Sequence, residues 1–177
     1  MGESGFKTYF EAVAGGAVSG AMVRGIVIVR DSDRDGGASF GKVKQMLRSI
    51  PGAPVPDKVL EIKRAGGFPA VESLLIPWHD RKGSLDTLLL DCLAHQDAER
   101  VSRCADEFAH CTGIDGWHVC DSSKVKLRCI LAALSRRNPG MAIRMIFDRT
   151  ECPFDLKHPS IDAVADYLKK FALEVGA

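Results

Sequence analysis

The chain lacks any apolar run that approaches the roughly 20 residues needed to cross a bilayer. It also lacks the charged segment followed by an apolar core that marks a secretory signal peptide. Its six cysteines include no Cys-x-x-Cys pair and no spacing typical of a small disulfide-bonded secreted protein. These absences predict a cytoplasmic protein with reduced thiols and no membrane partner.

Charge of one sign is also scarce, because 24 Lys and Arg against 23 Asp and Glu leave a net charge of only +1. Such a balance gives the whole molecule no general attraction to nucleic acid or to a membrane, so any site for a polyanion must be a local basic patch. Hydrophobic residues are not scarce. They make up 46% of the 177 residues, which is enough to bury the core of one domain.

Apolar patterning predicts strands and helices that alternate along the chain. The expected strands are 25–30, 58–63 and 70–76, and the expected helices are 6–14, 39–50, 84–94, 98–111, one that opens at Ser122 or Ser123 and ends before Asn138, and 161–173. Ser39 and Ser84 are the expected N-caps of their helices. The segment 141–147 is compatible with strand or helix. The alternation predicts one α/β domain over residues 1–177, with a mostly parallel sheet flanked by helices and a helical C-terminal portion.

The most informative stretch is an apolar, β-branched run over residues 25–30 that leads directly into three aspartates. The run lacks polar alternation, which predicts a central parallel strand with both faces covered. Asp31, Asp33 and Asp35 follow it, and in open α/β sheets ligands bind just beyond the carboxyl ends of the strands. Gathered carboxylates need a cation or basic groups nearby, and hard oxygen ligands suit Mg²⁺, Mn²⁺ or Ca²⁺. The alternative is a solvated acidic turn that Arg34 partly neutralises.

Spacing separates three known uses of such a motif. An EF-hand loop needs a bidentate glutamate at position twelve, where this chain has Lys42, so an EF-hand is excluded. A haloacid-dehalogenase-type phosphotransferase places Thr or Val where this chain has Asp35, which makes that match weak. The third use is the TOPRIM domain, in which a strand ends in Asp-x-Asp, often Asp-x-Asp-x-Asp, and a helix follows. Residues 26–40 resemble this motif without a misfit.

A second segment strengthens the resemblance to TOPRIM. Residues 76–86, Ile-Pro-Trp-His-Asp-Arg-Lys-Gly-Ser-Leu-Asp, leave a strand, cross a polar loop and open a helix. They resemble a segment of small TOPRIM relatives of the OLD (overcoming lysogenisation defect) nucleases, in which a strand ending in Pro is followed by Gly-small-Leu-acid at a helix start. The acid of this pattern falls on Asp86, which is one methylene shorter than the more usual Glu. The alternative is a first-turn acid that the helix dipole favours.

The resemblance implies a nuclease-like enzyme that processes phosphodiester bonds in nucleic acid and depends on Mg²⁺ or Mn²⁺. It implies Asp31 as the main metal ligand, Asp33 as a second ligand and Asp35 as an outer partner, with Asp31, Asp33 and Asp86 as the catalytic residues. Nucleic-acid phosphates would contact a rim of basic side chains, although a solvated basic face explains each of them alone. The candidates are Arg34, Lys82 and Lys126, with Arg81, Lys124 and Arg128 beside them.

One departure from the family pattern leaves a second function open. TOPRIM catalysis uses a glutamate at the end of the first strand, and this chain has Met1 at that position. Glu3 would have to reach back from the start of a helix to replace it. The alternative is therefore a catalytically impaired TOPRIM module that binds nucleic acid, a protein partner or a second copy of the chain.

Other polar residues give weaker signals. Cysteines and histidines cluster between residues 104 and 120, but their spacing matches no closed zinc site, and we expect no zinc. Cys104 and Cys111 are seven positions apart, which is compatible with one buried helix face. Trp78 could stack on a base, but an isolated tryptophan at a strand end more often packs in the interior.

Overall fold

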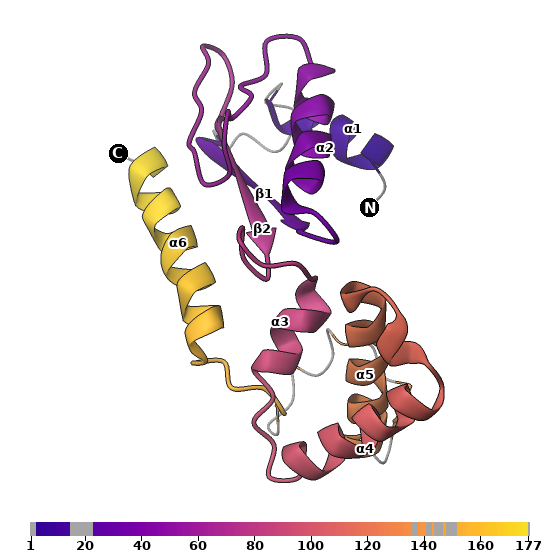
Figure 1. Ribbon diagram of the computed structural model, residues 1–177. Helices are drawn as coiled ribbons and strands as arrows, with labels where there is room; N and C mark the ends of the chain where they lie inside the picture. The colour runs from indigo at the N-terminus through magenta and orange to yellow at the C-terminus, as the bar shows by residue number, and fades with distance from the viewer. Residues whose placement is uncertain are drawn as a thin grey trace.

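A two-stranded parallel sheet organises the amino-terminal half of the computed structural model, which describes residues 3–14, 23–135, 138–140, 143, 147 and 152–176. Strand β1 (Gly25–Asp31) pairs with β2 (Ala70–Ile76), from Gly25 opposite Ala70 to Asp31 opposite Ile76. Because the strands are parallel, their carboxyl ends meet at one edge of the sheet (Figure 1). The acidic loop that follows β1 therefore lies beside the loop that follows β2.

One face of the sheet carries a core shared with helices α1 (Glu3–Ala14) and α2 (Gly36–Arg48) (Figure 1). Apolar residues at helical spacing on α2 meet the β-branched and leucine side chains of one sheet face, which removes this surface from water. The buried members of this core are Phe10, Ile28, Phe40, Val43, Leu47, Ile50, Val71 and Leu75.

A second core lies beyond the carboxyl ends of the strands, between α3 (Leu85–Asp91) and α5 (Val119–Leu134) (Figure 1). Helix α4 (Ala98–Cys111) and a short 3₁₀ turn η1 (Ile114–Gly116) pack against α5. Leucines of α3 and α5 interdigitate in the second core with the segment that precedes the last helix. The buried members are Leu88, Leu89, Cys92, Leu127, Leu131 and Phe154. This core fixes α5 against α3, which starts directly at the sheet edge.

The last helix, α6 (Pro159–Gly176), runs from the second core back along the sheet (Figure 1). Its C-terminal half lies so close to β1 that a Cβ atom added at Gly25 would be 2.7 Å from Cζ of Phe171. The guanidinium groups of Arg24 and Arg64 donate hydrogen bonds to the carbonyl oxygens of Gly176 and Glu174. Two cations thus satisfy carbonyls that the end of a helix leaves without partners.

Several predicted elements are confirmed. The strand 70–76 and the helix 98–111 have the predicted bounds, and the helices expected at 6–14 and 161–173 extend to Glu3–Ala14 and Pro159–Gly176. Ser84 is the N-cap of α3, although this helix ends at Asp91, before Ala94. The segment 141–147 lies outside the described residues apart from Ile143 and Phe147.

Two helices begin earlier than predicted. Asp35, and not Ser39, is the N-cap of α2, and its Oδ1 accepts the backbone N–H groups of Gly37 and Ala38 at 2.8 and 3.2 Å. Helix α5 begins at Val119, after His118 as N-cap, and not at the predicted serines. Ser39 and Ser123 share one cause: each is buried in the first turns of its helix and bonds to a neighbouring segment instead of capping. Ser122 bonds to the carbonyl oxygen of Val119 within α5.

The predicted strand at 58–63 is wrong. Leu60 has a φ of 64°, which breaks an extended conformation, and the segment makes only one antiparallel bridge, between Lys63 and Val71. The prediction that β1 is central is also wrong for the described residues, because the sheet there has two strands and Val29 of β1 is 49% exposed. Strand β2 is the more buried one, since β1 flanks it on one side and the chain around Lys63 on the other.

The described residues form a mixed α/β fold of six α-helices and a two-stranded parallel sheet. A larger parallel sheet is not present among them. None of the described helices combines the length and the apolar character needed to span a membrane.

Candidate functional site

The acidic loop after β1 is held against the loop after β2. Ser32 is fully buried, and its Oγ lies within hydrogen-bond distance of the carbonyl oxygens of Ile76 (3.1 Å), Arg81 and Gly83 (3.3 Å). Asp33 has a φ of 53° and exchanges two backbone hydrogen bonds with Gly83, at 2.8 and 3.1 Å. The aspartates therefore belong to a fixed two-loop platform, which distinguishes them from a loosely solvated turn.

Asp31 joins this platform to the start of α3. Its Oδ1 accepts the backbone N–H of Leu85 at 3.0 Å. Burial is the largest influence on the Asp31 carboxyl and raises its pKa, and the charges of Asp33 and Asp86 raise it further. The Leu85 hydrogen bond and the charge of Lys124 act in the opposite direction. The structure thus brings three predicted catalytic carboxylates, from two separate segments, into one electrostatic group.

The third aspartate of the loop has a different role. The Oδ1 atom of Asp35 caps α2 through its two backbone hydrogen bonds, and an N-cap of this kind stabilises a helix by about 1 kcal/mol. Asp35 is exposed at the first turn of α2. Its place around a metal ion stays a prediction, and its capping role is what the structure shows.

The predicted basic residues separate into two groups. Lys126 forms an ion pair with Asp106 of α4 at 2.7 Å, so its ammonium group is already engaged on another side of α5. Lys124, two residues earlier, is the lysine whose charge reaches Asp31. Arg34 is exposed on the acidic loop and Lys82 is exposed on the loop after β2. Lys124 is therefore a stronger candidate for a phosphate contact than Lys126.

A chain of buried hydroxyl groups fixes α5 beside the carboxylates. The backbone N–H of Ser84 donates to Oγ1 of Thr87 at 3.2 Å, and Oγ1 of Thr87 lies 3.2 Å from Oγ of Ser123. All three residues are buried. Sequence reasoning missed Thr87 and the role of Ser123, and the only local signal was two hydroxyl residues near two expected helix starts.

The cysteines and histidines do not form a zinc site in the described structure. All six cysteines are free, and Cys104 and Cys111 are exposed, which corrects the expectation of a shared buried face. His110 contacts Asp115 at 2.9 Å, and Nδ1 of His118 accepts the backbone N–H of Cys120. Among the described residues, no three His, Cys, Asp or Glu side chains are placed to hold a metal ion by themselves. This statement covers the aspartate platform as well.

Trp78 packs against α6. Its ring meets Tyr167 edge-on, with centroids 6.2 Å apart at 90°, and lies tilted beside His79 at 5.6 Å. Trp78 is half-buried, which supports the packing role over base stacking.

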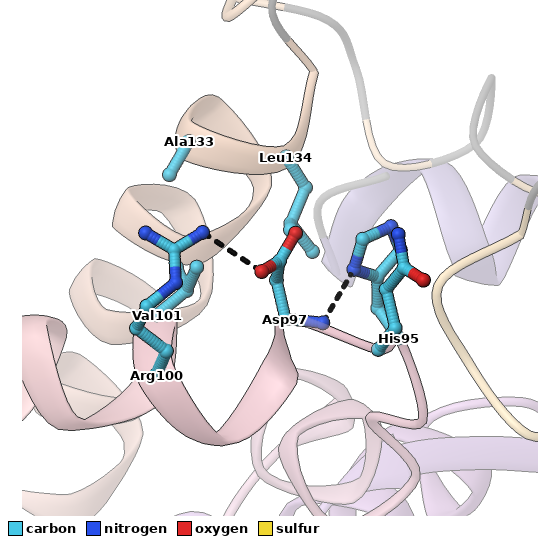
Figure 2. Close-up of a pocket in the computed structure, with 7 residues that line it drawn as sticks. His95, Asp97, Arg100, Val101, Ala133 and Leu134 are labelled. Atoms are coloured by element: carbon cyan, nitrogen blue, oxygen red, sulfur yellow. Dashed lines mark hydrogen bonds and ion pairs between the residues drawn. The ribbon is translucent and has the colours of Figure 1, made fainter.

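A pocket of about 350 Å³ lies between the start of α4 and the end of α5 (Figure 2). Its polar groups satisfy one another: Arg100 pairs with Asp97 at 2.8 Å, and the backbone N–H of Asp97 donates to Nδ1 of His95 at 3.1 Å. The pocket sits at the opposite end of α5 from Lys124 and Ser123, so it is separate from the carboxylate platform. The lining residues are His95, Gln96, Asp97, Arg100, Val101, Ala133 and Leu134.

Comparison with known proteins gives one result. A family model described as "Protein of unknown function (DUF3226)" matches residues 7–173, a range that includes the sheet, the carboxylate platform and most of α6. No curated protein and no solved structure matches the chain significantly. The comparison makes no TOPRIM or OLD nuclease assignment. The chain belongs to the DUF3226 family of proteins of unknown function.

Proposed function

We propose that this chain processes phosphodiester bonds in nucleic acid with the help of a divalent cation at Asp31 and Asp33, with Asp86 beside them as the third catalytic carboxylate. The observation that carries the proposal is the hydrogen bond between Oδ1 of Asp31 and the backbone N–H of Leu85, 3.0 Å long and spanning 54 positions of the sequence. This bond holds the acidic loop against the first residue of α3, next to Asp86, and so supports a shared role for the two segments that resemble TOPRIM and OLD sequences.

The donor set fits a hard cation. All three side chains offer carboxylate oxygens, which Mg²⁺ and Mn²⁺ prefer. The negative charges of Asp33 and Asp86 already raise the pKa of Asp31, so a positive ion would relieve a repulsion that Lys124 only partly offsets. A divalent cation bound there would polarise a phosphate oxygen and stabilise the leaving oxygen.

The protein side chains do not complete a metal shell by themselves, as the absence of a three-ligand cluster among the described residues indicates. Mg²⁺ usually keeps several waters and takes further ligands from substrate phosphates. We therefore expect weak metal binding without nucleic acid and tighter binding with it. Lys124 and Arg34 are the exposed cations that would hold the phosphate backbone.

A module that binds nucleic acid without cutting it is the second candidate. TOPRIM catalysis uses a glutamate, whereas the charged groups with the largest influence on the pKa of Asp31 are Asp33, Asp86 and Lys124. The loss of a general acid or base commonly costs about 10²–10⁴-fold in rate. A site that works with these carboxylates alone should therefore cleave slowly.

The first experiment measures metal binding by thermal unfolding with and without Mn²⁺. A cation that binds only the folded state raises the melting temperature by mass action. The double variant Asp31→Asn with Asp33→Asn should lose this rise. Asp162→Asn with Asp166→Asn, which removes two exposed carboxylates from α6, should keep it. An equal rise in both double variants would place the metal elsewhere.

The second experiment measures nicking of supercoiled plasmid and cleavage of labelled single strands in Mn²⁺ and Mg²⁺. Slow cleavage that Asp31→Ala or Asp86→Ala abolishes supports the enzyme. Binding of nucleic acid without any cleavage supports the second candidate. Cleavage that survives both substitutions would show that the activity does not belong to this site.

A further inference from the structure

The amino-terminal end of α5 lies at the edge of the carboxylate platform. Asp31 bonds to Leu85 at the start of α3, and Thr87, in the first turn of α3, contacts Ser123 in the first turns of α5. The first turn of α3 therefore connects Asp31 to α5 through one hydrogen bond on each side. The Cys120 thiol agrees with this placement, because burial and then the charges of Asp33 and Asp31 raise its pKa.

An exposed aromatic residue stands directly before this end of α5. Trp117 closes the 3₁₀ turn η1, comes three residues before Cys120 and is 55% exposed. Val119, the first residue of α5, is 36% exposed beside it in the sequence. A tryptophan ring left in water at a helix start has no role in either buried core. Tyr9 of α1 is as exposed as Trp117, but Trp117 is the one that precedes the helix beside the carboxylates.

We propose that Trp117 is a stacking platform for an unpaired base, so that the carboxylate site takes single-stranded nucleic acid. This inference rests on the proposed function, because it assumes that nucleic acid occupies the platform. The charge at the site supports it: Arg34 and Lys124 are exposed cations on the acidic loop and on α5, and the charge of Lys124 reaches Asp31, so both offer contacts to phosphates at the carboxylates. An aromatic ring beside a basic track is the usual arrangement for single strands.

Duplex nucleic acid fits this surface less well. Stacking on a protein ring needs a base whose face is free, and the bases of a duplex already stack on one another. A tryptophan ring can stack on any of the bases. We therefore expect the protein to prefer single strands over duplex, without preference for a particular sequence. Trp117 thereby takes the stacking role that sequence analysis considered for Trp78, whose ring packs on Tyr167.

Tryptophan fluorescence gives a direct test, because the chain has only two tryptophans. In the variant Trp78→Phe, Trp117 is the sole reporter. Titration with a short oligothymidylate in Mg²⁺, under which the cation can sit between the carboxylates and the phosphates and only slow cleavage is expected, should quench its emission. A duplex of the same length should quench it less. Absence of quenching at saturating oligonucleotide, or equal quenching by the duplex, would overturn the proposal.

Binding measured by fluorescence anisotropy of a labelled oligonucleotide tests the energetic role. Trp117→Ala should weaken binding by about 5- to 100-fold, which is the worth of one stacked base, and Trp117→Phe should restore most of it. Tyr9→Ala is the matched control, since Tyr9 is an aromatic residue 56% exposed on α1. Unchanged binding by Trp117→Ala refutes the inference.

The same measurements separate the failure of this inference from the failure of the proposed function. Oligonucleotide binding that depends on Trp117, with no metal-dependent cleavage, supports the stacking platform and refutes the enzyme. Cleavage lost in Asp31→Ala but unaffected by Trp117→Ala supports the enzyme and refutes the platform. A Trp117 emission that changes with protein concentration alone, and not with oligonucleotide, would place Trp117 in an interface between copies and overturn the inference.

Discussion

Replacing Glu72 by glutamine should change how the stability of the protein depends on pH. Glu72 lies in the middle of β2, is 2% exposed, and has an Oε2 atom without a hydrogen-bond partner among the described residues. Side chains alternate along a strand, and Val71 points into the core with α1 and α2. Glu72 therefore points to the opposite face, where Lys170 and Glu174 of α6 contribute the charges that act on it.

The magnitude follows from the pKa of this carboxyl. Burial, with a smaller contribution from Glu174, raises the pKa of Glu72 from 4.5 to about 7, and Lys170 opposes this rise. One pKa unit corresponds to 1.36 kcal/mol, so full burial of the charge would lower the free energy of unfolding by about 3 kcal/mol. Water entry beside α6 reduces such a penalty, and we expect about 1 to 3 kcal/mol.

The direction of the effect is fixed by linkage. The folded protein holds the Glu72 proton more tightly than the unfolded chain, so this contribution to stability is fully present below pH 4.5 and is lost as the pH rises through about 7. Above that pH the loss is constant. The wild-type protein should therefore be less stable at pH 8 than at pH 5, by the amount given above, as far as Glu72 is concerned.

Urea unfolding followed by circular dichroism at pH 5, 6, 7 and 8 measures this loss. The five histidines titrate in the same range, but they are identical in wild type and Glu72→Gln, so the difference between the two proteins isolates Glu72. Glu174→Gln should move the wild-type transition to lower pH, and Lys170→Gln should move it to higher pH. Parallel stability curves for wild type and Glu72→Gln from pH 5 to 8 would refute the reasoning.

Four further substitutions test the fold and the site. Gly25→Ala puts a Cβ atom 2.7 Å from Cζ of Phe171, and such overpacking should lower the free energy of unfolding by about 1–3 kcal/mol. An unchanged midpoint of urea unfolding would contradict the packing of α6 on β1. Asp35→Ala removes the N-cap of α2 and should cost about 1 kcal/mol in the same assay, and no loss would mean that the cap contributes nothing. Lys126→Ala should lower the free energy of unfolding by less than about 1 kcal/mol and leave oligonucleotide binding unchanged. Lys124→Ala should weaken oligonucleotide binding. Weaker binding by Lys126→Ala and unchanged binding by Lys124→Ala would refute the assignment of the two lysines.

Local sequence determined the elements with strong, well-punctuated patterns. The strand 70–76 is a mostly apolar segment, interrupted only by Glu72 and Ser73, between Pro69 and Pro77. The helix 98–111 shows a clear amphipathic period, so both were predictable from residues within the element itself. The acidic loop was equally predictable, because a buried strand that ends in several aspartates places them at the sheet edge whatever the rest of the chain does.

Tertiary contacts decided the ends of the helices and the fate of the weaker segments. Ser39 and Asp35 are both good N-caps by type, and burial of Ser39 against the carbonyl of Ser32 leaves Asp35 as the cap. The alternation at 58–63 looks like a strand, but the left-handed conformation of Leu60 interrupts it. Short elements gain too little from local propensity to resist such contacts.

The candidate site divides in the same way. Its carboxylates at Asp31 and Asp33 were visible in the sequence, because they follow one strand. The side chains that complete their surroundings come from distant segments. The packing of α3 against α5 brings Lys124 to Asp31, and the packing of α4 against α5 gives Lys126 its partner on α4. The residue that ends a strand can be predicted from the sequence, because it depends on the residues next to it along the chain. The helix that packs at that end cannot be predicted in this way. Its position depends on the burial of apolar surface between elements that are far apart in the sequence.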